Sequence, residues 1–116
     1  MDKIEVRVGG SLKDDLAEFA AVWKKAASGQ RVAPKRILAF ESWEGLARVM
    51  TPERYRLLRH LHGHPEASIL SLSKSLQRQY RRVHDDVVAL EDVGLVDRTG
   101  AALVATADSI TAEITL

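Results

Sequence analysis

The chain has 116 residues, of which 46% are hydrophobic and 28% charged, and it contains no cysteine. This length and composition suit a globular protein with one domain, or one small domain and an accessory segment. The absence of cysteine excludes disulfides, thiol catalysis and thiolate metal sites. No apolar run approaches the roughly 20 residues of a membrane helix and the N-terminus lacks a signal-peptide core, so we expect a cytoplasmic protein without membrane association.

The net charge of +1 hides a strong asymmetry along the chain. Residues 54–84 hold seven Arg or Lys and a single acid, Glu66, whereas residues 85–116 hold seven acids and a single cation, Arg98. A basic segment inside a neutral chain suits local phosphate binding without general adhesion to anions.

The N-terminal part predicts a strand, a helix and a second strand. Residues 3–8 alternate apolar and charged side chains, the pattern of a strand with one exposed face. The spacing predicts a helix over 11–28 and a short strand over 34–40. Because two strands and one helix make a marginal domain, we expect residues 1–41 to form a dimerisation arm. The aromatic residues available for a shared core are Phe19 and Trp23.

Two helices are predicted to follow the arm. Ser42 is suited to cap a short helix over 43–50, and Thr51 followed by Pro52 starts another that ends near Gly63. Its expected apolar face has either Tyr55 or Leu57, together with Leu58 and Leu61.

The segment from Ser68 to Val93 predicts a helix-turn-helix. Ser68 is a good N-cap, and the apolar residues behind it have helical spacing: Ile69, Leu72 and Leu76. The second helix has an apolar stripe at Tyr80, Val83, Val87 and Leu90, and Gly94 ends it.

Arginines begin the polar face of the second helix. The unpaired amides and positive dipole end of a helix N-terminus bind anions, so Arg78, Arg81 and Arg82 suit phosphate there. Guanidinium groups also pair bidentately with guanine edges. The alternative interpretation is a charged face that is merely exposed to solvent.

Strands are predicted after Gly94. Residues 95–97 and 103–106, with Gly100 between them, predict a strand, a tight turn and a strand. Alternation over 109–116 predicts a last strand that pairs with another element, for which the strand over 3–8 is one candidate. The order of elements predicts an α+β fold in which residues 42–116 form a winged helix-turn-helix with a C-terminal strand, preceded by the strand-helix-strand arm.

The chain resembles a family of small MarR-type regulators. The similar segments are FESWEGLARVMTPERYRLLRHL at 40–61, YRRVHDDVVALEDVGLV at 80–96 and DSITAEITL at 108–116. The resemblance implies a DNA-binding regulator, in some members an antitoxin that represses its own operon and binds a small toxin protein. It places Arg81, Arg82 and His84 at the base-reading start of the recognition helix.

Two positions depart from that family. Gln77 stands where relatives often have a helix-breaking glycine, and Asp85 stands where they often have a cation. An acid cannot contact phosphate favourably, although it can accept a hydrogen bond from cytosine N4.

The sequence therefore predicts a homodimer that places residues 79–92 in the major groove of a palindromic double-stranded operator. Arg81 and Arg82 are expected to contact bases or adjacent phosphates, and His84 either contacts DNA or packs against Tyr80. The predicted DNA-binding residues are Lys74, Arg78, Gln79, Tyr80, Arg81, Arg82, His84 and Arg98.

Competing functions have weaker support in the sequence. His60, His62 and His64 suggest a metal site, but Gly63 and Pro65 interrupt the helix that would align them, and we expect no metal and no cofactor. Asp85 and Asp86 diverge by about 100° on a helix, and no nucleophile motif is present, so we expect no catalysis. The stronger alternative is a winged-helix module that binds a partner protein without DNA.

Overall fold

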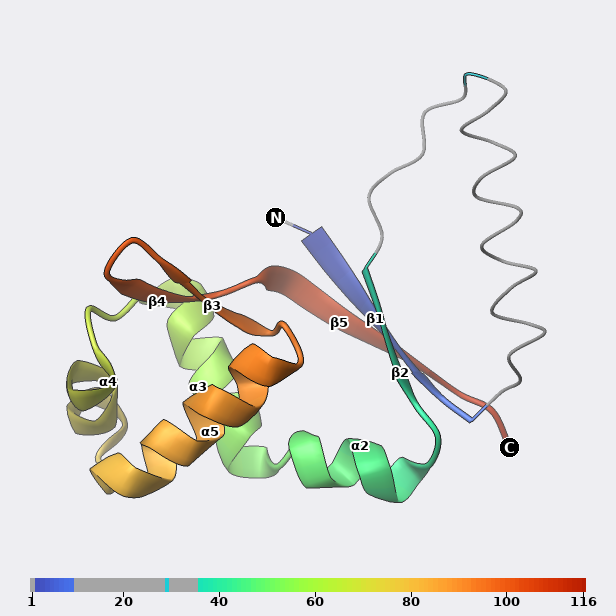
Figure 1. The fold of residues 1–116 in the computed structure, drawn as a ribbon, viewed down its shortest axis with the longest axis horizontal. Helices are drawn as coiled ribbons and strands as arrows, with labels where there is room; N and C mark the ends of the chain where they lie inside the picture. Colours follow the sequence, from blue (N-terminus) through green and yellow to red (C-terminus); the bar gives the residue numbers. More distant parts are fainter. Residues whose placement is uncertain (1, 10–28, 30–35) are drawn as a thin grey trace.

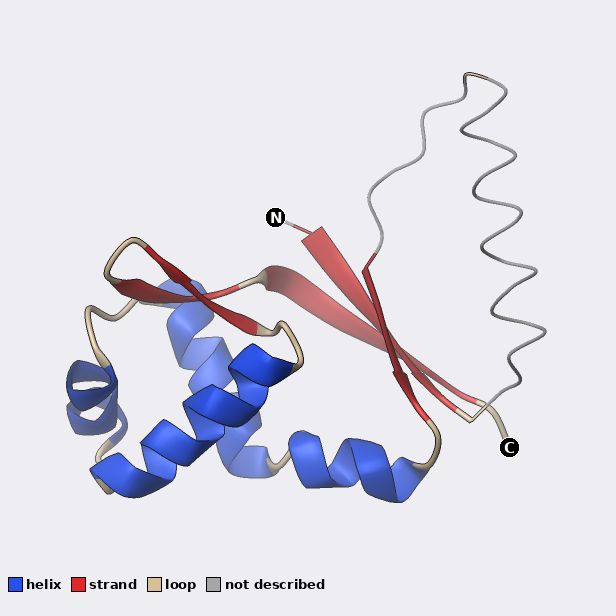
Figure 2. Ribbon diagram, viewed as in Figure 1, coloured by secondary structure: helices blue, strands red, loops and turns tan. Residues whose placement is uncertain are grey.

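The computed structural model describes residues 2–9, 29 and 36–116, and it shows a mixed α and β fold (Figures 1 and 2). The predicted helix over 11–28, with Phe19 and Trp23, lies outside the described residues. The described strands and helices, in chain order, are β1 (Asp2–Val8), β2 (Arg36–Phe40), α2 (Trp43–Val49), α3 (Pro52–Gly63), α4 (Ile69–Leu76), α5 (Tyr80–Asp92), β3 (Val96–Thr99), β4 (Ala102–Ala105) and β5 (Ala107–Ile114).

One sheet joins β1 and β5, which stand first and last among the described strands. It has three strands in the order β2-β1-β5, and β1 runs parallel to both neighbours. Val6 lies opposite Leu38 on one side and Ala112 on the other. The predicted pairing of the C-terminal strand with another element is confirmed, and its partner is β1, the one candidate named from the sequence. β5 begins two residues earlier than predicted, because Asp2 of β1 already pairs with Ala107. The two predicted units, 1–41 and 42–116, thus both contribute strands to this sheet: β1 and β2 come from the first and β5 from the second.

Burial follows the predicted apolar spacing in most elements. Alternate residues of β1 are buried, as are Leu57 and Leu61 of α3, so Leu57 and not Tyr55 faces the core. Tyr80 departs from the predicted stripe of α5, because its side chain is 49% exposed at the first turn, beyond the edge of the core. The buried hydrophobic residues are Ile4, Val6, Val8, Leu57, Leu61, Ile69, Leu72, Val83, Val87, Leu90, Leu95, Val96, Leu103 and Ala105.

Arg36 connects the sheet to the helical part of the molecule. Its Nη2 donates to the carbonyl oxygen and the hydroxyl of Thr106, at 3.1 and 2.8 Å. Its Nη1 donates to the carbonyl oxygen of Gly94, just after α5, at 3.4 Å. One side chain of β2 therefore ties together the end of α5 and the junction between β4 and β5.

The β3–β4 hairpin is antiparallel and gains a third backbone partner in Glu66. Val96 lies opposite Ala105 and Thr99 opposite Ala102, as the predicted strand-turn-strand requires. Glu66 exchanges both backbone hydrogen bonds with Leu103, at 3.2 and 2.7 Å. The segment between α3 and α4 is thereby attached to the hairpin.

The carboxylate of Glu66 extends that attachment to two helices. It accepts hydrogen bonds from the hydroxyls of Ser71 and Ser75 on α4, and its Oε1 lies 3.3 Å from Nε2 of His60 on α3. The Ser71 hydrogen bond is the main reason that the pKa of Glu66 lies below its ordinary value of 4.5, and His60 and Ser75 lower it further. The single acid of the basic segment is thus a structural junction.

Among the helices that the structure describes, none is long and apolar enough to cross a membrane.

We predict that Glu66 makes the stability depend on pH. Because its folded pKa is lowered, its contribution to the free energy of unfolding is fully present above about pH 4.5 and is lost as the pH falls through the folded value. Glu66→Gln should lower the free energy of unfolding at pH 7 and should flatten its decline below pH 4.5. Urea denaturation across this pH range checks both effects. If the free energy of unfolding declined as steeply in the variant, other acids would be the cause of the decline.

Candidate functional site

Helix α4 ends in a left-handed turn at Gln77, which sets the direction in which the chain enters α5. Gln77 has φ 55° and ψ 46°, a conformation that normally selects glycine. Its N–H donates to the carbonyl of Lys74 at 3.2 Å, and the N–H of Arg78 donates to the carbonyl of Ser73 at 3.0 Å. This pair of bonds is the Schellman pattern of a helix C-terminus. Gln77 thus takes a left-handed conformation that glycine would adopt without a Cβ clash.

The N-terminus of α5 is open to an acceptor from outside. Gln79 precedes the helix in extended conformation, and its side chain makes no capping hydrogen bond. At α4, in contrast, the hydroxyl of Ser68 accepts from the N–H of Ser71 at 3.0 Å. The first amides of α5 therefore lack the side-chain cap that α4 has, and an anion is a suitable replacement.

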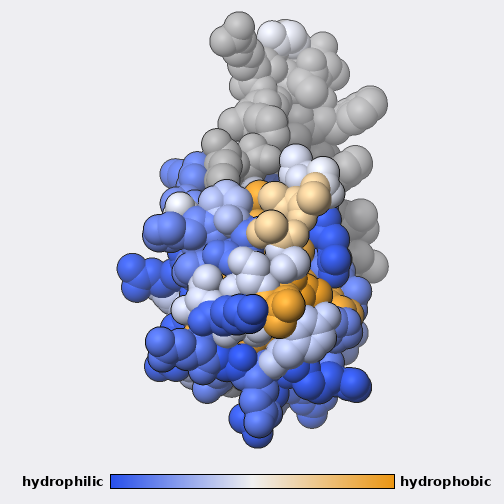
Figure 3. Space-filling view, turned by 90° about the vertical axis from the view of Figure 1, so that its left-hand side faces the viewer, coloured by the Kyte–Doolittle hydropathy of each residue, from blue (hydrophilic) through white to orange (hydrophobic). Residues whose placement is uncertain are grey.

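Three cations near this helix start are exposed: Lys74, Arg81 and Arg82. Arg82 is exposed, and the side chain of Arg81 is 85% exposed while its Nε lies 3.4 Å from Oδ1 of Asp85, one turn further along the helix. Lys74, in the last turn of α4, is also exposed. This end of the molecule, which carries α4 and the tip of the hairpin, is mostly hydrophilic with a small apolar patch (Figure 3).

Tyr80 and His84 lie together on α5. Their ring centroids are 6.1 Å apart with the planes inclined by 33°, and Nδ1 of His84 is 3.4 Å from Oδ1 of Asp85. Tyr80 is half-exposed and His84 is partly buried. Packing of His84 against Tyr80, one of the two alternatives left open by the sequence, is present in the structure.

Arg78 points into the fold and pairs with Asp86. Its Nη2 donates to Oδ2 of Asp86 at 2.7 Å, while Nε of Arg54 on α3 donates to the other carboxylate oxygen at 3.0 Å. Arg54 also donates to the carbonyls of Arg48 and Val49, both at 3.0 Å, at the end of α2. The nearly buried Asp86 of α5 thereby joins α3 to the turn between α4 and α5, and Arg54 extends the network to the end of α2. Arg78 is committed to this network rather than directed outward.

Arg98 lies apart from the other predicted contacts. On β3, it donates through Nε and Nη2 to Oε1 of Glu91, at 3.1 and 3.0 Å, near the C-terminal end of α5. Glu91 follows Arg81 by ten residues, or about 15 Å along a helix. The structure thus brings together Lys74, Gln79, Tyr80, Arg81, Arg82 and His84 around the start of α5, but not Arg98.

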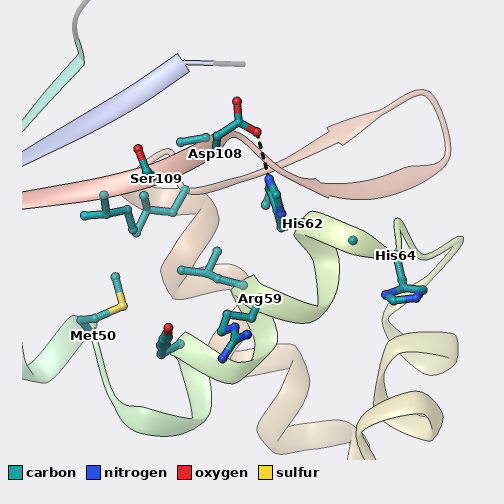
Figure 4. Close-up of a pocket in the computed structure, with 13 residues that line it drawn as sticks. Met50, Arg59, His62, His64, Asp108 and Ser109 are labelled. Carbon is teal, nitrogen blue, oxygen red and sulfur yellow. Dashed lines mark hydrogen bonds and ion pairs between the residues drawn. The ribbon is translucent and has the colours of Figure 1, made fainter.

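A groove lies on another side of the molecule, between α3 and the start of β5. It has a volume of about 570 Å³ and is lined by apolar residues such as Met50, Leu58 and Ile110, together with the polar Arg59 and His62. Nε2 of His62 is 2.9 Å from Oδ1 of Asp108, and this pair bridges the two walls (Figure 4). The His62 interaction is the main cause of the lowered pKa of Asp108. The imidazole of His62 thus has Asp108 as its carboxylate partner, and the imidazole of His60 has Glu66.

The Asp86 network could not be predicted from sequence spacing. Asp86 and Arg54 are 32 residues apart, so no local spacing connects them. Its neighbour Asp85 is equally acidic but lies on the exposed face of the same helix. In contrast, the isolation of Glu66 among seven cations was a visible signal of a special role.

We predict that Gln77→Gly stabilises the protein. Glycine adopts the left-handed conformation without the Cβ clash that costs about 1–2 kcal/mol, and its greater freedom in the unfolded chain offsets part of the gain, so the net increase should be about 0.5–1 kcal/mol. Thermal or urea denaturation measures it. Gln77→Ala is the matched control because it keeps the Cβ; an equal gain in both variants would exclude backbone strain as the cause.

We also predict that Asp86→Ala lowers the free energy of unfolding by about 2–3 kcal/mol, because it leaves Arg54 and Arg78 without their shared carboxylate. Asp85→Ala, which removes an exposed charge from the adjacent position, should change it by less than about 0.5 kcal/mol. Equilibrium denaturation compares the two, and similar losses would contradict a specific role for Asp86.

Comparisons with known proteins match the chain to a family model. The family model described as HVO_A0114 matches residues 49–112, from the end of α2 through most of β5. No curated protein and no solved structure matches the chain. The match spans more than half of the 116 residues, including the α4–α5 turn and the hairpin. The chain therefore belongs to the HVO_A0114 family.

Proposed function

We propose that this protein is a sequence-specific DNA-binding transcriptional regulator. In this proposal α3, α4, α5 and the β3–β4 hairpin form a winged helix-turn-helix of the MarR type, and α5 is the recognition helix. The observation that carries it is the uncapped N-terminus of α5 surrounded by the exposed cations Lys74, Arg81 and Arg82.

The construction of α5 supports this role. One face packs into the core through the buried Val83, Val87 and Leu90, and Asp86 on α5 is hydrogen-bonded to Arg54 of α3 and to Arg78 of the preceding turn. The opposite face, with Arg81, Arg82 and Asp85, is exposed along the first two turns. A rigid helix with a polar outer face is what entry into a major groove requires.

The contacts divide into two classes in this proposal. Lys74 and the free amides of α5 contact the phosphate backbone, while Arg81 and Arg82 reach base edges or the phosphates beside them. Gln79, Tyr80 and His84 form the surrounding surface. Arg78 acts indirectly by orienting α5 through Asp86, and Arg98 contacts DNA only if the duplex extends to the far end of the helix.

We propose further that the protein is an antitoxin that represses its own operon and binds the cognate toxin. The support is the charge separation, because acids exposed away from the start of α5 leave a surface for a basic partner. These acids include Asp92, Asp97 and Glu113. If the basic face instead has no role in DNA binding, a winged-helix module for protein partners is the alternative.

The experiment is binding of the purified protein to its own upstream intergenic DNA and to a scrambled duplex. With about six phosphate contacts in a dimer, affinity should fall about 10³-fold between about 50 and 200 mM salt. We expect tighter binding to the upstream DNA, with Arg81→Ala/Arg82→Ala removing that preference.

The control variant is Arg48→Ala/Arg56→Ala, which removes the same charge from exposed positions on α2 and α3. It should retain the preference and lose only a small part of the affinity by reducing the net positive charge. Equal losses of affinity in both double variants would mean that DNA binding depends on general electrostatics and not on Arg81 and Arg82 in particular. Absence of any preference for the upstream duplex would favour the protein-binding alternative.

A further inference from the structure

The outer edge of β5 has unpaired backbone groups. The N–H of Thr115 donates to the carbonyl of Val8, so the odd-numbered residues of this strand direct their backbone groups toward β1. The even-numbered residues, Ile110, Ala112 and Ile114, therefore direct theirs outward. Within residues 2–9 and 36–116, the sheet ends at this strand.

The same edge exposes apolar side chains. Ile110 and Ile114 are 41% and 43% exposed, although they lie on the sheet face where Ile4 and Val8 of β1 are buried. An irregularity at Asp108 limits the regular edge to residues 109–114. This edge contains neither lysine nor proline, the residues that commonly prevent strands from associating.

We propose that a second copy of this chain covers the edge, with the two β5 strands antiparallel about a two-fold axis at Ala112. The two sheets then form one continuous sheet across the dimer. Ala112 lies opposite its own counterpart, and Ile110 lies opposite Ile114 of the second copy.

Backbone geometry and side-chain direction select this register together. Outward backbone groups occur on the even-numbered residues, and hydrogen-bonded antiparallel pairs require such groups on both strands. The exposed isoleucines are also even-numbered, so pairing of even with even residues keeps the apolar face continuous. A shift by one residue would lose both the hydrogen bonds and the match of faces. The chosen register gives about six hydrogen bonds between the copies.

Charge is compatible with this register. Glu113, the only charged residue of the regular edge, lies on the other face and opposite Thr111 of the second copy, so like charges do not meet. Asp108 lies before the paired length and has His62 as a partner. The strand is therefore self-complementary without an ion pair.

The groove beside α3 enlarges the surface. Ile110 lines it together with Met50 and Leu58, so the side chain of Ile114 from the second copy would lie at its margin. A stable dimer buries roughly 800 Å² on each partner, more than the edge of one short strand offers. The groove supplies apolar area for the remainder.

Cysteine cross-linking tests the register without DNA, so its result is independent of the proposed function. The chain has no cysteine, and Ala112→Cys introduces one thiol on the axis, with Cα atoms about 5.5 Å apart in a hydrogen-bonded pair. We expect near-complete disulfide-linked dimer under mild oxidation. In Thr111→Cys, each Cα is about 7–8 Å from its counterpart, and linkage should be at least about ten-fold slower. Equal rates would overturn the register.

Ala112→Pro tests the interface itself. Its N–H points outward and donates to no acceptor among the described residues, so proline should preserve the fold while removing central hydrogen bonds between copies. Sedimentation should give a dimer for the unmodified chain and half that mass for the variant, with unchanged circular dichroism. A variant that stays dimeric, or an unmodified chain that is monomeric at micromolar concentration, would overturn the proposal.

Discussion

The orientation of α5 depends on one nearly buried carboxylate, that of Asp86. A charge removed from water is costly unless it is paired, and here Arg54 and Arg78 each occupy one oxygen of the carboxylate. These partners come from α3 and from the turn before α5, and Arg54 extends to the end of α2. The network defines the rotation of α5, while the apolar stripe beneath it provides the hydrophobic stabilisation. The exposed face of the helix follows from this arrangement.

Arginines at neighbouring positions have opposite roles in consequence. Arg78 and Arg81 are three residues apart, and both looked like candidates for phosphate contact. The turn at Gln77 directs Arg78 toward Asp86, whereas Arg81 is carried on the outer face of the first turn of α5. The electrostatic character of the surface therefore comes from fewer cations than the sequence contains. Its position is set by backbone conformation as much as by charge.

The sequence predicted the described elements well, because apolar spacing and helix caps are local signals: Ser42, Thr51 and Ser68 all accept the expected capping hydrogen bonds. Side-chain partners that depend on tertiary contacts could not be predicted in this way. Arg36 lies in a short strand, yet it bonds to Thr106, 70 residues away. The exposure of Tyr80 could not be predicted either, because apolar periodicity defines one face of a helix but not where the core beneath that face ends. The sequence predicted the residues at the start of α5, but it did not predict that Arg78 pairs with Asp86 inside the fold.

The parallel pairing of β1 with β5 has a consequence for synthesis on the ribosome. Asp2 pairs with Ala107, so the central strand of the sheet must wait for a neighbour that is translated 105 residues later. At usual elongation rates this delay is about 5–20 s, long compared with the formation of helices and hairpins. During that time β2 is the one strand among the described residues that β1 can pair with. Nascent chains of this protein are therefore open to chaperones, or to association with one another, until β5 emerges.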